Sequence, residues 1–149
     1  MAAGLPGILS PAYIQITPFL SLPKLELGVV TLEVRVVIAD DSLFMRTYIK
    51  NLLNNSKYKV IGEASDGCEA VSVYKELKPD ILILDLTMDC MDGMTALQRI
   101  MEFDCAARII ICSAMGQSRN VTAALKHGAK DFIVKPYFER FLLTLDNIS

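Results

Sequence analysis

Five short apolar runs recur along residues 33–149, and each is followed by a segment with the periodicity of an amphipathic helix. Most of the runs contain Val or Ile, and the run 81–84 is apolar at every position. This pattern is typical of parallel strands that helices cover on both faces. Regular alternation of such strands with helices predicts an α/β fold built on an open, doubly wound parallel sheet.

The predicted elements follow one another without an internal repeat. The expected strands are 34–39, 58–64, 81–85, 108–113 and 131–134, and the expected helices are 44–53, 69–77, 94–103, 117–127 and 137–145. Ser42 or Asp41 is the expected cap of the first helix, and Gly128 is the expected stop of the fourth. Because crossovers between parallel strands are right-handed, we expect the flavodoxin-like strand order 2-1-3-4-5.

The first 32 residues differ in composition from the rest of the chain. They contain no charged residue before Lys24 and carry prolines at positions 6, 11, 18 and 23. Prolines at this spacing interrupt the helix that a signal peptide or a membrane span requires. We therefore expect 1–32 to be a poorly ordered or non-native extension and 33–149 to be the folded domain. A docking arm that covers a groove is the alternative.

The composition argues against nucleic-acid binding, a membrane span and a cysteine-based metal site. The net charge is −2, which disfavours a general nucleic-acid binder, and no segment reads as a membrane span. The four cysteines are Cys68, Cys90, Cys105 and Cys112; they form no CxxC pair, and the chain has a single histidine. We expect them to behave as small apolar residues in a reducing cytoplasm, without a metal-ligand cluster.

Polar residues follow four of the five predicted strands at the point where each strand ends. Asp40 and Asp41 follow the first strand, Asp85 ends the third, Ser113 ends the fourth and Lys135 follows the fifth. In a doubly wound sheet, ligands bind beyond these carboxyl ends, at the switch in strand order. Three carboxylates at one edge would repel one another, and a hard divalent cation such as Mg²⁺ relieves that repulsion.

These residues together suit phosphoryl transfer to a carboxylate. Asp85 is the candidate nucleophile, and Lys135 and Mg²⁺ would neutralise charge on the transferring oxygens. Ser113 would donate a hydrogen bond to the attached phosphoryl group. A single aspartate after a strand is usually a helix cap, but this set at successive strand ends in this order points to a common site.

The same residues resemble the response-regulator receiver family over about residues 34–147. The resemblance rests on Asp40-Asp41, Asp85, Ser113 and Lys135-Pro136, and on the strings GEASDG at 62–67, MDG at 91–93 and GAKDF at 128–132. The strings IICSAMGQ at 110–117 and DFIVKP at 131–136 are similar to those of CheY-like chemotaxis receivers. Receivers within larger regulators share these strings.

The resemblance implies a role for each acidic residue. Asp85 would be the phosphorylation site. Asp41 would bind Mg²⁺ directly and Asp40 would bind it through water, while Thr87 would offer its backbone carbonyl to the metal.

The resemblance also implies a switch. Lys135 would contact the phosphoryl group, and its peptide bond to Pro136 is expected to be cis. Phosphorylation would draw Ser113 toward the phosphate, and Phe132 would turn inward into the vacated space. An ordinary core aromatic is the alternative reading of Phe132.

One position departs from the family pattern. Asp89 stands where receivers usually have proline, and it adds a negative charge near the expected metal. Thr87 and Met115, which would flank the approach to the phosphoryl group, carry no amide or carboxylate to orient water. We therefore expect slow self-dephosphorylation and dependence on a separate phosphatase.

The favoured function is a single-domain response regulator rather than an enzyme. It would receive its phosphoryl group from a histidine kinase and signal by binding, with a flagellar motor-switch protein as the partner that the resemblance suggests. The output surface would lie on the fourth helix, fifth strand and fifth helix. A stand-alone receiver of another pathway and a phosphorylation-independent interaction module remain alternatives. An aspartyl phosphatase is disfavoured because Thr87 stands at the position of its second aspartate, and a flavodoxin because Asp40 and Asp41 would repel a flavin phosphate.

Overall fold

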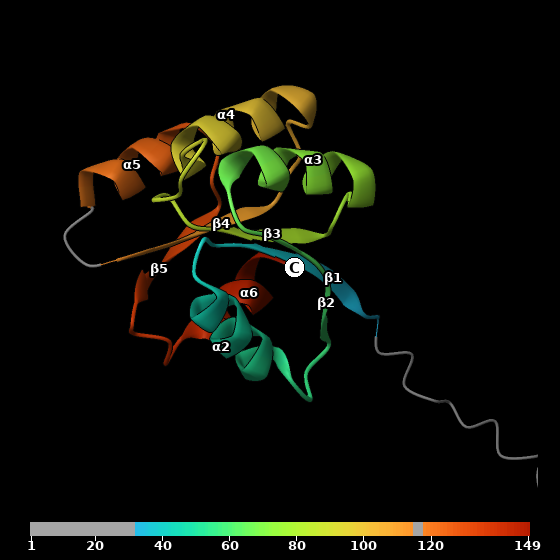
Figure 1. Cartoon of the computed structure of the whole chain (residues 1–149). Helices are drawn as coiled ribbons and strands as arrows, with labels where there is room; N and C mark the ends of the chain where they lie inside the picture. Colours follow the sequence, from blue (N-terminus) through green and yellow to red (C-terminus); the bar gives the residue numbers. More distant parts are fainter. Residues whose placement is uncertain (1–31, 115–117) are drawn as a thin grey trace, which may run out of the picture. The chain divides into compact units, whose positions relative to one another are not determined.

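The structure is a computed structural model that describes residues 32–114 and 118–149. Its strands form one parallel sheet in the order β2-β1-β3-β4-β5, which confirms the predicted topology (Figure 1). The strands are β1 (Val34–Ala39), β2 (Tyr58–Ala64), β3 (Ile81–Leu84), β4 (Ile109–Ala114) and β5 (Asp131–Lys135). The expectation for residues 1–32 falls, except for Leu32, outside the described residues.

Helices cover both faces of the sheet. They are α2 (Leu43–Leu53), α3 (Gly67–Leu77), α4 (Gly93–Phe103), α5 (Ser118–Lys126) and α6 (Phe141–Ile148). Figure 1 shows α3, α4 and α5 on one face and α2 and α6 on the other. Within the part of the chain that the structure describes, no helix is long and apolar enough to cross a lipid bilayer.

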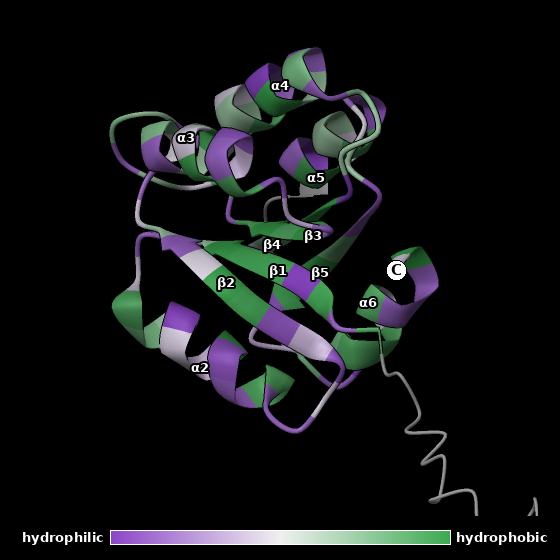
Figure 2. Ribbon diagram, turned by 90° about the vertical axis from the view of Figure 1, so that its right-hand side faces the viewer, coloured by the Kyte–Doolittle hydropathy of each residue, from purple (hydrophilic) through white to green (hydrophobic). Residues whose placement is uncertain are grey.

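The period of two along each strand produces two hydrophobic cores. In β3, Leu82 and Leu84 pack toward the core beneath α3 and α4, whereas Ile81 and Ile83 pack toward the core above α2 and α6. All four side chains are at most 1% exposed, as expected for a central strand. Figure 2 shows the apolar character of the strands continuing through the middle of the domain.

Helix ends follow the local sequence. The Ser42 side chain accepts a hydrogen bond from the Met45 amide and caps α2, and Asp66 and Asp92 cap α3 and α4 in the same way. Gly128 follows α5 with a φ of 108°, a conformation that favours glycine. Each of the three caps satisfies a backbone amide in the first turn of its helix.

The last helix begins later than the sequence predicts. The Tyr137 amide donates to the Val134 carbonyl and the Phe141 amide donates to the Phe138 carbonyl, so two turns follow β5 and helix α6 begins at Phe141 rather than at Tyr137. These turns bury Phe138, whose ring packs against Tyr48 at 5.2 Å and against Phe141 at 5.9 Å between ring centroids. Burial of this aromatic residue outweighs the local helical preference.

Candidate functional site

Three acidic side chains meet at the carboxyl edge of the sheet. Oxygen atoms of Asp40, Asp41 and Asp85 all lie within 4.8 Å of one another. The register that pairs Ala39 of β1 with Leu84 of β3 brings the residues after them together, and the Asp85 amide donates to the Ala39 carbonyl at 2.8 Å. Asp40 is 1% exposed and Asp85 is 5% exposed, whereas Asp41 is exposed. The sequence prediction that these carboxylates share one site is confirmed by their geometry.

The backbone on either side of Asp40 is held by hydrogen bonds. One oxygen of its side chain accepts a hydrogen bond from the Ser42 amide at 2.9 Å, and its carbonyl accepts one from the Arg46 guanidinium at 2.7 Å. Arg46 also pairs with Glu63 of β2 at 3.1 Å. Sequence reasoning missed Arg46, because its spacing on α2 is that of an ordinary surface residue.

Lys135 enters the acidic cluster from the end of β5. Its ammonium lies 2.6 Å from a carboxylate oxygen of Asp40 and 3.4 Å from one of Asp85. The sequence predicted an approach toward Asp85, and the shorter contact is to Asp40. The peptide bond between Lys135 and Pro136 is cis, as the resemblance implied.

The charges of the site shift the pKa values of its members. Burial raises the pKa of Asp85, and the neighbouring charge of Asp40 raises it further; Lys135 and the Thr87 amide offset part of this rise. Burial alone would lower the pKa of Lys135, but its hydrogen bond to Asp40 and the nearby carboxylate charges outweigh burial and raise it. A lysine that remains charged therefore faces a carboxylate that ionises reluctantly.

The loop after β3 is packed tightly against α4. A Cβ atom on Gly93 would overlap the carbonyl oxygen of Asp85, and the Gly93 amide donates to the Leu86 carbonyl at 2.9 Å. The Thr87 amide donates to a carboxylate oxygen of Asp85 at 3.2 Å. This packing fixes the direction of the Asp85 side chain and explains the glycine of the MDG string.

The two residues expected to form a switch lie on neighbouring strands. Ser113 is 1% exposed near the end of β4, and Phe132 on β5 is 40% exposed. Asp89 is exposed in the loop after β3. Met115, named with Thr87 in the expectation of slow dephosphorylation, lies outside the described residues.

The four cysteines are all free thiols, and they differ in burial. Cys112 is buried in β4, but Cys68, Cys90 and Cys105 are exposed. The sulfur atoms of Cys68 and Cys90 lie within 4.8 Å of a carboxylate oxygen of Asp66, a proximity that the sequence spacing did not predict. The cause is that helix starts and loops, rather than the core, hold these thiols.

The donor atoms of the first cluster suit a metal ion. Three carboxylates at one edge, two of them buried, are the ligands that hard divalent cations prefer. The lysine beside them can neutralise a further anion bound at the same place. This arrangement can therefore hold both a metal ion and an oxyanion next to Asp85.

Known proteins share this fold and sequence. The sequence model of the response regulator receiver domain matches residues 36–145. The chain is 54% identical over 103 residues to the chemotaxis protein CheY of Listeria monocytogenes, covering 69% of this chain and 87% of the relative. It is also 54% identical over 103 residues to the chemotaxis protein CheY of Thermotoga maritima, covering 69% of this chain and 86% of the relative.

A solved structure agrees with these relatives. The match is to the CheX–CheY–BeF3–Mg complex of Borrelia burgdorferi, with a TM-score of 0.74 and 41% identity, covering 77% of this chain and 88% of that chain. Sequence, topology and the acidic cluster thus point to the same family. The chain belongs to the response regulator receiver family and is a CheY-like receiver, a signalling protein rather than an enzyme.

Proposed function

We propose that Asp85 accepts a phosphoryl group from a histidine kinase with the help of Mg²⁺, and that the phosphorylated form signals by binding another protein. The observation that carries this proposal is the meeting of Asp40, Asp41 and Asp85 within 4.8 Å, with the Lys135 ammonium 3.4 Å from Asp85. A structural ion-pair network needs no third carboxylate. A phosphoryl-transfer site needs a nucleophile, metal ligands and a cation together.

The metal would be held by this chain's own oxygen atoms. Asp40, Asp41 and Asp85 would supply carboxylates, and Thr87 would supply its backbone carbonyl. When bound, Mg²⁺ supplies positive charge that stabilises the oxygens of the transferring group. The related Borrelia burgdorferi complex contains Mg²⁺, which supports the choice of this cation.

Asp85 is the nucleophile in this proposal. One of its carboxylate oxygens attacks phosphorus, an O–P bond forms, and the N–P bond to the histidine of the kinase breaks. Lys135 then moves the short distance from Asp40 to an oxygen of the new phosphoryl group, which its flexible stem permits. Burial keeps competing water away from the acyl phosphate.

Ser113 and Phe132 would convert the modification into a change of surface. The Ser113 hydroxyl would donate to the phosphoryl group, and the half-exposed Phe132 ring would turn inward. The equilibrium between two packed arrangements would thus be biased by one charge-assisted hydrogen bond.

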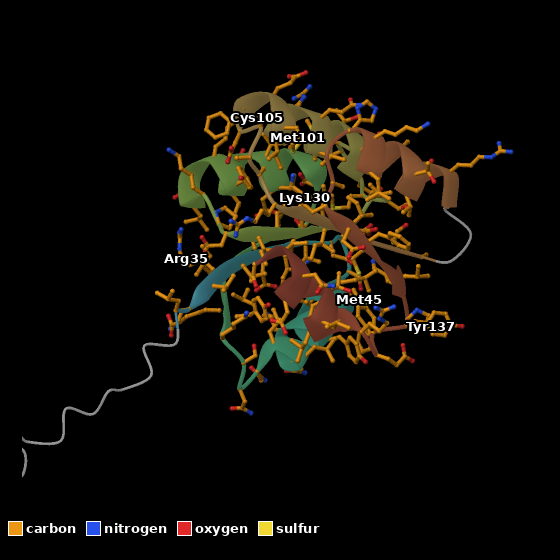
Figure 3. The ribbon with its side chains drawn as sticks, turned by 180° about the vertical axis from the view of Figure 1, so that it is seen from behind. Arg35, Met45, Met101, Cys105, Lys130 and Tyr137 are labelled. Atoms are coloured by element: carbon orange, nitrogen blue, oxygen red, sulfur yellow. The ribbon has the colours of Figure 1, made fainter. Side chains whose placement is uncertain are left out.

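The output surface would lie on α5, β5 and α6. Large apolar side chains are exposed there, namely Leu125, Phe132, Tyr137, Leu142 and Leu143. Figure 3 shows Tyr137 projecting from this side of the molecule. The names of the relatives favour chemotaxis, so we propose a flagellar motor-switch protein as the partner and a cytoplasmic location.

A separate phosphatase is part of the proposal. Thr87 carries no carboxylate or amide that could orient an attacking water, so the acyl phosphate on Asp85 should persist without a partner. The related Borrelia burgdorferi CheY forms a complex with CheX, which supports a second protein as the partner of a receiver.

An NMR titration tests the switch. Amide spectra are recorded with Mg²⁺ alone and then with Mg²⁺ and beryllofluoride, an analogue of a phosphoryl group on aspartate. We expect shifts at Asp85, Ser113 and Phe132 in the wild type and in Asp89→Asn, which removes a nearby acid outside the cluster. Asp85→Asn should abolish them. Unchanged spectra in the wild type would favour the phosphorylation-independent interaction module instead.

A further inference from the structure

Two exposed thiols lie in contact beside the candidate phosphorylation site. The sulfur atoms of Cys68 and Cys90 are 3.3 Å apart, close enough for one thiol to donate a hydrogen bond to the other. Cys68 lies in the first turn of α3, and Cys90 lies in the loop between β3 and α4. The two residues are far apart in sequence, so the fold itself brings the thiols together.

The backbone around the pair holds the two segments together. The Gly67 amide donates to the Met91 carbonyl at 3.0 Å, and a Cβ atom on Gly67 would overlap that same carbonyl oxygen. These residues are the immediate neighbours of Cys68 and Cys90. Approach of the two sulfur atoms therefore does not depend on side-chain rotation alone.

Backbone preference does not explain a cysteine at position 90. Cys90 has a φ of 65°, in the left-handed region that favours glycine and asparagine. The thiol occupies this position although other residues would suit the backbone better. Its contact with Cys68 is the feature that distinguishes it from a simple turn residue.

We propose that Cys68 and Cys90 form a reversible intramolecular disulfide when the protein meets a peroxide. This site is separate from phosphoryl transfer and does not depend on it. The ligand class is a small oxidant that can reach an exposed thiol.

The chemistry balances with one peroxide for each bond. Either thiol of the pair can donate the hydrogen bond that joins them, and attack by Cys68 illustrates the reaction. The Cys68 sulfur attacks one peroxide oxygen and the O–O bond breaks, leaving a sulfenic acid and hydroxide, which takes up a proton. The Cys90 sulfur then attacks the sulfenic sulfur, the S–O bond breaks, and the hydroxyl group leaves as water with the Cys90 proton. Two thiols and one peroxide thus become one disulfide and two waters, and a dithiol reverses the bond.

The positions of Cys105 and Cys112 exclude them from this disulfide. Cys112 is buried and burial raises its pKa to about 12, so it stays a protonated thiol. Cys105 follows the C-terminal end of α4 (Figure 3), whereas Cys90 precedes the N-terminal end of this helix. The eleven residues of α4 span about 16 Å. Neither can compete for the contact between Cys68 and Cys90.

A metal is the alternative occupant of this pair. Oxygen of Asp66 lies within 4.8 Å of both sulfur atoms, which makes three candidate ligands. However, one oxygen of Asp66 already accepts the Glu69 amide at 2.8 Å as the cap of α3. The thiol pair in contact favours the disulfide, and the metal becomes an outcome of the test.

The bond would tie α3 to the loop that follows Asp85. That loop carries Thr87 and Asp89, so a covalent link at Cys90 would reduce its local opening. Amide hydrogen exchange of residues 86–92 should slow several-fold on oxidation and recover with dithiothreitol. This readout needs neither Mg²⁺ nor a phosphodonor, so it stands even if the proposed phosphorylation fails.

Peptide mapping tests the proposal directly. The reduced full chain is treated with hydrogen peroxide in EDTA, blocked with maleimide and digested with trypsin without reduction. Cleavage after Lys59, Lys75, Arg99 and Arg108 puts the four cysteines on separate peptides. We expect the 60–75 and 76–99 peptides to be joined, and maleimide-reactive thiols in the native protein to fall from three to one.

Matched variants identify the pair. Cys105→Ser should form the same cross-link, and Cys68→Ser should lose it while keeping its native circular dichroism. A cross-link through Cys105, or three reactive thiols after peroxide treatment, would overturn the proposal. Native mass spectrometry with Zn²⁺ tests whether the pair binds a metal ion instead. We expect no stable zinc complex. A one-to-one zinc complex of the wild type that is lost in Asp66→Asn would overturn the disulfide proposal in favour of a metal site.

Discussion

The Asp85→Asn variant should be more stable than the wild type when no metal is present. At an effective dielectric constant of 20, the Lys135 ammonium at 3.4 Å attracts the Asp85 carboxylate by about 5 kcal/mol. Asp40, at no more than 4.8 Å, repels it by about 3.5 kcal/mol or more, and the exposed Asp41 adds about 1 kcal/mol in nearly bulk water. These Coulomb energies almost cancel.

Because the Coulomb energies almost cancel, they do not offset the desolvation of the Asp85 carboxylate, which is 5% exposed. Desolvation of a buried ion costs several kcal/mol, and the hydrogen bond from the Thr87 amide recovers part of this cost. A neutral amide of the same shape avoids this cost. We therefore expect Asp85→Asn to raise the free energy of unfolding by about 2 kcal/mol at pH 7.5 in EDTA.

The pH dependence follows from the direction of the shift. The pKa of Asp85 is raised in the fold above its ordinary value of 3.8, so the folded state holds a proton that the unfolded state has lost. The wild type is thus stabilised by protonation of Asp85 at low pH, and this stability is lost as pH rises through the raised pKa. The advantage of Asp85→Asn should be small near pH 4 and complete above the raised pKa.

Urea unfolding followed by circular dichroism measures these values, with Asp89→Asn as the matched control that should change little. Mg²⁺ should reverse the order of stability. A metal at 100 times its Kd stabilises the wild type by about 2.7 kcal/mol and should not stabilise Asp85→Asn to that extent. If Asp85→Asn is less stable than the wild type in EDTA at pH 7.5, the account of a site strained by buried charge is wrong.

Three further perturbations test the packing of the domain. Gly93→Ala should lower the free energy of unfolding by about 3 kcal/mol or prevent folding, because the added methyl group would overlap the Asp85 carbonyl. Urea unfolding measures this loss, and expression of the variant only as aggregate would indicate that it does not fold. Tyr74→Phe should lower the free energy of unfolding by about 1–2 kcal/mol through loss of the 2.7 Å hydrogen bond to Asp104, whereas Tyr137→Phe at an exposed site should change it by less than about 0.5 kcal/mol. Equal effects of the two tyrosine substitutions on the free energy of unfolding would contradict a stabilising role for the hydrogen bond between Tyr74 and Asp104. Peroxide oxidation of the thiol pair in the α3 and β3–α4 segments should stabilise the fold by about 3 kcal/mol, measured by urea unfolding with and without dithiothreitol. No change in the midpoint would refute this magnitude.

The strands were predictable because each carries its own signal. The bounds of β1 and β2 match the expected 34–39 and 58–64. In β1 a β-branched run ends at Asp40, and in β2 a run centred on Val60 and Ile61 ends at Ser65. The acidic cluster was predictable for a related reason. Asp40 and Asp85 directly follow adjacent parallel strands, and topology alone brings such residues together.

Contacts between distant side chains were not predictable in the same way. Lys135 was expected near Asp85, but its ammonium lies closest to Asp40, a choice made by side-chain rotamers and local charge. Helix α6 begins at Phe141 because tertiary burial of Phe138 outweighs the helical preference of 137–140. The thiol contact between Cys68 and Cys90 depends on loop conformation, which composition and periodicity do not encode.

Mg²⁺-dependent phosphorylation of Asp85 is the central claim, and intact mass spectrometry tests it most directly. The wild type, Asp85→Asn and Asp89→Asn are incubated with acetyl phosphate, with and without Mg²⁺. The account predicts a single added phosphoryl group on the wild type and on Asp89→Asn, only when Mg²⁺ is present, and none on Asp85→Asn. An adduct that survives Asp85→Asn, or no adduct on the wild type with Mg²⁺, would contradict it.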